Sequence, residues 1–164
     1  MKYMLGLLLT TTAMLTHAQV LFPQQCIGKW QGTMQISSNG IVRDSVKVLF
    51  TAAQLTSESW TWRMEYLSPQ HPAVKDYVLK LKDKAKGIYS TDEGDGIELM
   101  DYQFGKKLYS VFEIPGTLLT ASYELISSNT LVFEVTSGKK NNSTGKDIFN
   151  YSVVSVQRVV LKKI

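Results

Sequence analysis

Residues 30–36 read WQGTMQI, and their alternation decides the fold class of the chain. The even-numbered positions carry apolar side chains or glycine, whereas the positions between them carry glutamine and threonine. Side chains alternate between the two faces of a β-strand, so the pattern predicts a strand with one buried face. Residues 37–40 (SSNG) follow, and Asn-Gly readily takes the positive φ angles of a tight turn. A second apolar alternation over 42–50 completes a predicted hairpin.

The same kind of alternation, interrupted by turn residues, continues to the end of the chain. It covers the segments 60–66, 88–91, 97–104, 108–114, 118–126, 131–135 and 147–162. An open sheet of this size would leave two exposed edges, and closing the sheet into a barrel removes them. We therefore predict an all-β fold, an up-and-down antiparallel β-barrel of about eight to ten strands with no assigned helix.

The segment 74–86 fits two structures. As a strand it places Leu79 and Leu81 on one face, whereas as a helix it forms an apolar stripe between Pro72 and Gly87, which are typical start and stop signals. The segments on both sides of it have the pattern of strands. We favour a strand, because agreement with the neighbouring elements is expected of a foldable sequence.

The N-terminal end of the sequence has the three-part pattern of a secretory signal. The positive charge of Lys2 precedes an apolar run over 4–15, and small residues stand three and one positions before a cleavage point. The run is shorter than the roughly 20 apolar residues that a spanning helix needs. We predict a signal peptide over 1–18, cleaved after Ala18, and one secreted or periplasmic domain over 19–164 without stable membrane insertion.

The single cysteine and the charge balance limit the partners of the mature domain. Cys26 is the only cysteine, which excludes an intramolecular disulfide. Residues 23–25 (PQQ) lack the apolar and small residues of a lipidation signal, so we disfavour a lipid anchor on Cys26. Without Lys2 the chain has 17 basic and 14 acidic residues, a net charge of +3. This small excess argues against a nucleic-acid partner, while the oligomeric state stays open.

Few residues of the mature chain suggest catalysis or metal binding. His71 is the one histidine left after cleavage, which excludes a histidine-based triad or a multi-histidine zinc site. Residues 92–96 (DEGDG) lack the spacing of a calcium-binding loop and predict a hairpin turn. Asp44 and Asp101 are the carboxylates that the alternation places on inward faces. We predict a protein that is not an enzyme and uses no metal or cofactor.

Two features near the ends of the domain resemble a known family. The residues Gly28-Lys29-Trp30 open the first predicted strand, and a lone arginine, Arg158, stands in the last one. This combination resembles the signature of the calycin superfamily, which includes lipocalins and fatty-acid-binding proteins. The resemblance implies a lipocalin-like barrel of the bacterial kind, in which Trp30 closes the base and Arg158 packs over its ring. The chain departs from the family in lacking two helices after the first strand and a disulfide.

A barrel of this size is wide enough to hold one small ligand, so we expect a small apolar or amphipathic molecule inside it. The candidate lining consists of inward apolar residues: Met34, Trp60, Trp62, Met64, Tyr66, Phe112, Tyr123 and Phe133. The same side chains would also fill a solid core, and the barrel would then act through its surface as an envelope or protein-interaction module. Residues 137–146 are polar, contain overlapping glycosylation sequons over 141–144 (NNST), and predict an exposed loop.

The predicted cleavage can be tested on the mature protein purified from the producing cells. Cleavage after Ala18 gives a chain that begins at Gln19, which can cyclise and block Edman chemistry, so the intact mass identifies the start. A mass corresponding to residues 19–164 is expected. A lipidated Cys26 at the N-terminus, or an intact Met1 in the membrane fraction, would contradict the predicted location.

Overall fold

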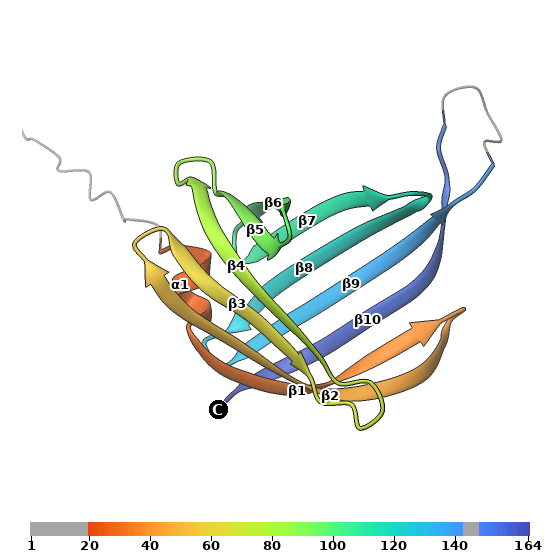
Figure 1. The fold of residues 1–164 in the computed structure, drawn as a ribbon, viewed down its shortest axis with the longest axis horizontal. Helices are drawn as coiled ribbons and strands as arrows, with labels where there is room; N and C mark the ends of the chain where they lie inside the picture. The colour runs from red at the N-terminus through yellow and green to blue at the C-terminus, as the bar shows by residue number, and fades with distance from the viewer. Residues whose placement is uncertain (1–19, 143–147) are drawn as a thin grey trace, which may run out of the picture.

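The computed structural model describes residues 20–142 and 148–164, which form ten strands and one short helix (Figure 1). The predicted signal peptide and residues 143–146 of the predicted 137–146 loop lie outside the described residues. No helix in the described part of the chain is long and apolar enough to cross a membrane. The elements, in order, are α1 (Phe22–Cys26), β1 (Gly28–Ser38), β2 (Ile41–Thr56), β3 (Ser59–Tyr66), β4 (Ala73–Asp83), β5 (Ile88–Gly94), β6 (Ile97–Phe104), β7 (Lys107–Ile114), β8 (Thr117–Ser127), β9 (Thr130–Lys140) and β10 (Tyr151–Lys163).

Each strand pairs antiparallel with the next one along the chain, and β1 pairs with both β2 and β10. The sheet is therefore a closed, up-and-down barrel, which confirms the predicted fold class. In the segment 74–86, which fits both a strand and a helix, residues 74–83 belong to β4 and residues 84–86 to the turn after it, so the preference for a strand is confirmed. Asn39 and Gly40 have φ angles of 52° and 74° in the turn between β1 and β2, as the Asn-Gly pair predicts.

Two strands continue five or six residues beyond the ends that the sequence predicts for them. β2 continues to Thr56, and β9 continues to Lys140, into the segment predicted as a loop over 137–146. That end of β9 is paired on both sides, to Thr117 of β8 and to Tyr151 of β10. The polarity of the segment reflects a sheet end whose side chains are largely solvated, and polar composition alone does not distinguish such a strand from a loop.

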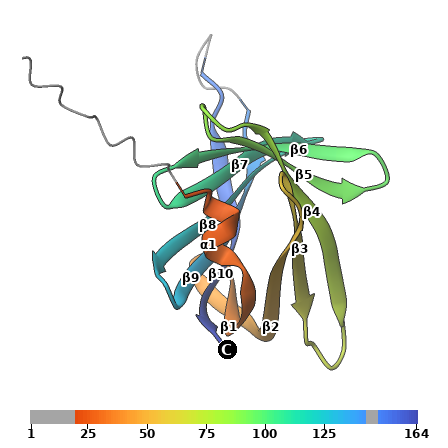
Figure 2. The same ribbon diagram turned by 90° about the vertical axis from the view of Figure 1, so that its left-hand side faces the viewer.

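The helix α1 closes one end of the barrel (Figure 2). Phe22 and Cys26 are fully buried, and the Phe22 ring lies 6.3 Å from the ring of Trp62. The indole Nε1 of Trp30, also fully buried, donates a hydrogen bond of 2.7 Å to the Cys26 carbonyl. Burial raises the pKa of the Cys26 thiol to about 12, so the thiol stays protonated. A helix of five residues is too short for a periodic pattern, which is why the sequence did not predict it.

The predicted contact between Trp30 and Arg158 is wrong. Trp30 is paired in register with Lys163, whose Nζ lies 5.1 Å from the Trp30 ring centroid. Arg158 is paired with Gln35, and its Nε lies 3.3 Å from a carboxylate oxygen of Glu134. The reason is the alternation of β10, which turns Arg158 outward. A lysine therefore takes the position over the ring that the family resemblance gave to an arginine.

The glycine of the Gly-x-Trp motif has a structural reason in this barrel. Gly28 has a φ angle of 131°, a backbone conformation that other residues rarely adopt. A Cβ atom on Gly28 would also lie 2.7 Å from the Cε atom of Lys163. Gly28 thus allows Lys163 to pass close to the start of β1 and reach the Trp30 ring.

Replacing Trp30 by alanine is expected to lower the free energy of unfolding by about 3 to 5 kcal/mol, because the change leaves a large cavity in the base of the barrel. Arg158→Ala is the matched control at an outward position and is expected to cost less than about 1 kcal/mol. Denaturation in urea measures both changes. Equal losses for the two variants would show that Trp30 does not hold the base together.

Candidate ligand-binding site

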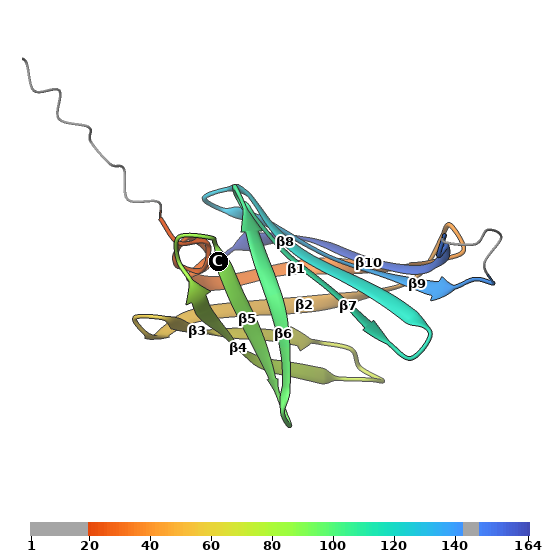
Figure 3. The same ribbon diagram turned by 90° about the horizontal axis from the view of Figure 1, so that it is seen from above.

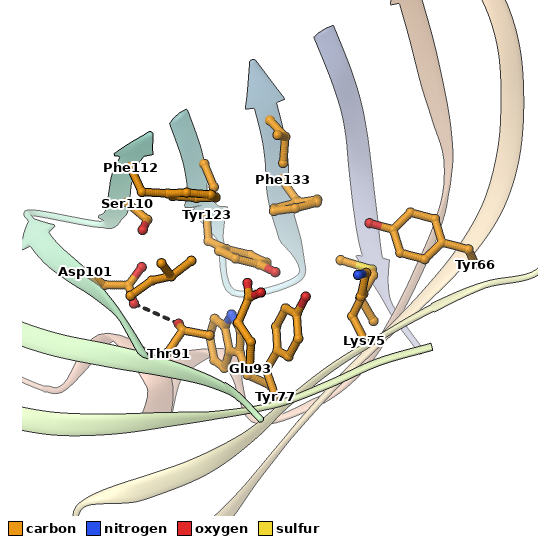
Figure 4. Close-up of a pocket in the computed structure, with 15 residues that line it drawn as sticks. Tyr66, Lys75, Tyr77, Thr91, Glu93, Asp101, Ser110, Phe112, Tyr123 and Phe133 are labelled. Atoms are coloured by element: carbon orange, nitrogen blue, oxygen red, sulfur yellow. Dashed lines mark hydrogen bonds between the residues drawn. The ribbon is translucent and has the colours of Figure 1, made fainter. Parts of the chain in front are cut away.

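The interior of the barrel contains a cavity of about 150 Å³, partly open to solvent, between strands β3 to β9 (Figure 4). This is about the volume of an engineered protein cavity that binds one benzene molecule. Most of its lining is apolar or aromatic, with a few polar and charged groups. The lining residues are Trp62, Met64, Tyr66, Lys75, Tyr77, Thr91, Glu93, Leu99, Asp101, Ser110, Phe112, Ala121, Tyr123, Phe133 and Val135.

A group of packed rings forms one wall of the cavity. The Tyr123 ring stacks on Phe133 with a centroid distance of 4.4 Å, and it meets Trp62 edge-on at 5.1 Å. Phe50 lies behind them, 5.5 Å from Tyr123 and 4.8 Å from Trp62. Rings in these arrangements attract each other beyond their simple burial. Because Trp62 also contacts Phe22 of α1, the base of the barrel supports this wall.

The Trp62 indole adds an unused donor to the same wall. Trp62 is 2 % exposed, and its Nε1 has no hydrogen-bond partner among the described residues. Burial raises the pKa of Tyr123 well above its usual value. The Trp62 indole N–H is near enough to oppose this rise in the pKa, but it does not meet the geometry of a hydrogen bond. A buried N–H without an acceptor is rare in proteins, and two indoles of the described residues have one: Trp62 in the wall of the cavity and Trp60 outside the cavity.

Six of the eight residues that the sequence proposed as a lining do line the cavity. They are Trp62, Met64, Tyr66, Phe112, Tyr123 and Phe133. Met34 and Trp60 do not; both are fully buried, and Trp60 packs against Tyr89 with ring centroids 6.5 Å apart. Alternation identifies the inward face of a strand, but it does not tell at which height along the barrel an inward residue lies.

Asp101 is the buried charged group of the cavity. It is 5 % exposed, and its Oδ2 accepts a hydrogen bond of 2.7 Å from the Thr91 hydroxyl. The strands explain its position: β6 and β7 pair over four residues, from Asp101 with Ser110 to Phe104 with Lys107. Beyond Asp101 and Ser110 the two strands separate, as Figure 3 shows. Asp101 therefore lies where the ladder ends and the cavity begins.

The electrostatic state of Asp101 differs from that of an ordinary aspartate. Burial raises its pKa to about 6, although the hydrogen bonds from Thr91 oppose the shift. The other carboxylate predicted to point inward, Asp44, is exposed, accepts a hydrogen bond from the Ser45 amide, and does not line the cavity. The structure thus brings Asp101 to the site and leaves Asp44 outside it.

β4 and β5 add three titratable groups to the cavity that the sequence did not single out. Burial, together with the charge and the hydrogen bond of Glu93, raises the pKa of Tyr77 to about 12. Glu93 is half-buried, whereas Lys75 is exposed. In Figure 4, Lys75 lies on the side of Tyr66 and Asp101 lies on the side of Ser110. The only sequence signal for these three residues was that each stands at an inward-facing position in the alternation of β4 or β5.

The remaining candidate for chemistry, His71, lies outside the cavity: it is exposed, and its backbone N–H donates to the Ser68 hydroxyl. The acidic segment 92–96 contains the predicted turn between β5 and β6, which consists of Asp95, at a φ angle of 53°, and Gly96. Residues 92–94 of this segment belong to β5, and Glu93 among them lines the cavity. No group of three or more histidine, cysteine or acidic residues in the described part of the chain is arranged to hold a metal ion.

No protein-family model matches the chain, and no curated protein is similar to it in sequence. Solved structures do match. The S-type phycobiliprotein lyase CpeS from Guillardia theta superposes with a TM-score of 0.64 at 10% identity, over 87% of this chain and 90% of that one. Rv2717c from M. tuberculosis gives 0.55 at 12% identity, over 85% and 93%.

A protein of the DUF3598 family from Nostoc punctiforme gives a TM-score of 0.61 at 12% identity. The match covers 87% of this chain and 49% of that one, so the chain spans about half the length of this neighbour. These neighbours are calycin-fold proteins, and the resemblance seen at Gly28 and Trp30 is confirmed at the level of the fold. Identities this low show the fold alone.

The raised pKa of Asp101 predicts a pH-dependent stability. The folded protein binds this proton more tightly than the unfolded chain does, so Asp101 favours folding below about pH 4 and loses that contribution as the pH rises through about 6. We therefore compare the free energy of unfolding of wild type with that of Asp101→Asn. The difference, wild type minus variant, should fall by on the order of 2 to 3 kcal/mol between pH 4 and 7.5.

Urea denaturation across this pH range measures the difference. The comparison with Asp101→Asn is needed because the carboxylates of Asp92 and Glu98, whose pKa values are lowered by hydrogen bonds from lysines, change stability in the opposite direction. Parallel profiles for wild type and variant would contradict the assignment.

Proposed function

We propose that this protein binds a small apolar or amphipathic molecule in the barrel cavity, and that it does so outside the cytoplasm after removal of its signal peptide. The proposed ligand places its apolar part against Trp62, Tyr123 and Phe133. Its polar part lies toward the wall that carries Asp101. No catalytic step is included in the proposal.

The observation that carries this proposal is the combination of an unfilled space with a buried acid. A barrel selected only for stability would fill its interior, because each cavity costs packing energy. Burying a carboxylate is also unfavourable unless it is paired or fully hydrogen-bonded. Both costs fall at the same place, beside Asp101, and a bound molecule would offset both. This favours the ligand-binding function over a filled barrel that acts only through its surface.

The position of Cys26 supports the proposed processing. Cleavage after Ala18 leaves α1 complete, so that Phe22 and Cys26 can close the base of the barrel. Lipid attachment at Cys26 would require cleavage directly before it and would remove Phe22. It would also require a thiol that the fold buries completely. The structure of the base therefore favours a free mature N-terminus over a lipid on Cys26 in this proposal.

The lining also guides the choice between a binding protein and an enzyme. It includes neither histidine nor cysteine, and its buried carboxylate bonds to Thr91 and not to a second acid. In general acid–base catalysis such a group usually acts together with a second titratable residue, and the titratable groups that β4 and β5 add to the lining, Lys75, Tyr77 and Glu93, make no hydrogen bond to Asp101. We therefore favour reversible binding as the role of the cavity.

Native mass spectrometry of protein purified from its own compartment tests the proposal directly. A non-covalent adduct of a small molecule is expected, together with saturable binding of the apolar dye N-phenyl-1-naphthylamine, whose phenyl ring fits the cavity while its naphthalene extends through the open side; quenching of tryptophan fluorescence measures this binding. Protein without an adduct that also shows no saturable quenching would refute the proposed function.

A substitution that fills the cavity should abolish this binding. Ala121 lines the cavity, and Ala121→Phe is expected to weaken dye binding by at least about tenfold, because the ring occupies the ligand's space. Ser122→Phe is the matched control, since the neighbouring residue of a strand points to the opposite face. Equal affinities for the two variants would show that the dye binds elsewhere.

A further inference from the structure

The charges around the cavity are arranged unevenly, and this arrangement bears on the ligand of the proposed function. The lining has two carboxylates, Asp101 and Glu93, and one ammonium group, Lys75. Asp101 is buried and Glu93 is half-buried, whereas Lys75 is exposed. A buried charge interacts more strongly than an exposed one, because less solvent screens it. The interior of the site is therefore negative, and its cation is at the surface.

Among the residues that the structure describes, Asp101 has no cationic partner that would account for its burial. The groups that influence its pKa besides burial are Thr91, Ser110 and Glu93, and none of them is a cation. The Thr91 hydroxyl occupies one acceptor position of Oδ2. The Thr91 backbone N–H and the Ser110 hydroxyl also act on the pKa of Asp101 as donors, so about one of the roughly four acceptor positions of an ionised carboxylate remains for a ligand. A buried carboxylate of this kind is stabilised best by a positively charged donor.

The aromatic wall suits the same type of ligand. The faces of tyrosine, tryptophan and phenylalanine rings carry partial negative charge and attract cations. Burial keeps the Tyr123 and Tyr77 hydroxyls protonated, so they add donors or acceptors without adding charge. An anionic ligand would find no buried cation here and would face the carboxylates of Asp101 and Glu93.

We propose that the cavity selects ligands with an aromatic or other apolar body and a protonated amine, and that the Asp101 carboxylate accepts the hydrogen bond of this amine. This inference rests on the proposed function and narrows its ligand class to cationic amphiphiles. Glu93 adds attraction at the half-buried side of the site. Lys75, on the other side, stays solvated and leaves the amine position free.

Three probes of one size and different charge test this selection. Benzylamine, benzyl alcohol and benzoate share a phenyl ring, which matches the cavity volume, and differ only in the attached polar group. Isothermal titration calorimetry at pH 7.5, where Asp101 is ionised, gives their affinities. Benzylamine is expected to bind at least about tenfold more tightly than benzyl alcohol, and benzoate more weakly than either.

Variants then assign the selection to Asp101. Asp101→Asn keeps an oxygen that can accept the Thr91 hydrogen bond, and it should reduce the preference for benzylamine over benzyl alcohol from at least about tenfold to less than about threefold. Asp95→Asn, in the exposed turn between β5 and β6, makes the same change in net charge and should keep the preference. If Asp101→Asn does not fold, the ranking of the three probes on wild type still decides the question.

The outcomes separate this inference from the proposed function. Equal binding of benzylamine and benzyl alcohol, or tighter binding of benzoate, would overturn the selection for amines and leave the ligand site in place. Failure of benzylamine to bind, with N-phenyl-1-naphthylamine still bound, would overturn it as well. If the dye and all three probes fail to bind, both the inference and the proposed function are refuted.

Discussion

The pairing of the first strand with the last is the constraint on which the rest of the structure depends. β1 bonds to β10 with Trp30 opposite Lys163, and this contact turns a ten-stranded sheet into a ring without edges. The ring buries Trp30, whose indole holds the Cys26 carbonyl and with it α1. α1 places Phe22 beneath Trp62, where the wall of the cavity begins.

From this base upward, the strands pass from a filled interior to a cavity. The fully buried residues Trp60, Tyr89 and Leu79 form one hydrophobic core with Phe22 and Cys26 of α1, and space opens where the pairing of β6 and β7 ends at Asp101. A stable core and an unfilled, charged site thus occupy different levels of one barrel. The core supplies rigidity, and the site keeps the acidic group and the rings in position before any ligand arrives.

The sequence predicted those features that follow from alternation and turns. It predicted the strand order, the closed barrel and six residues of the lining. These follow from neighbouring residues alone, because the alternation within one strand shows which side chains face inward. It missed α1, whose five residues are too few for a periodic signal, and it assigned Arg158 to a contact that Lys163 makes. It also could not place Met34 and Trp60 at the correct level, or join Asp101 to Thr91, since register between strands is not visible in one strand's pattern.

The most direct test of the cavity as a ligand site uses the three tryptophan indoles as reporters within one protein. In a heteronuclear NMR titration with benzylamine, the Nε1–H signal of Trp62 should shift with saturation, because Trp62 lines the cavity. The Nε1–H signal of Trp30 should stay in place, because it is bonded to Cys26 in the base. A shift of Trp30 alone, or no shift of Trp62 at saturation, would contradict the account.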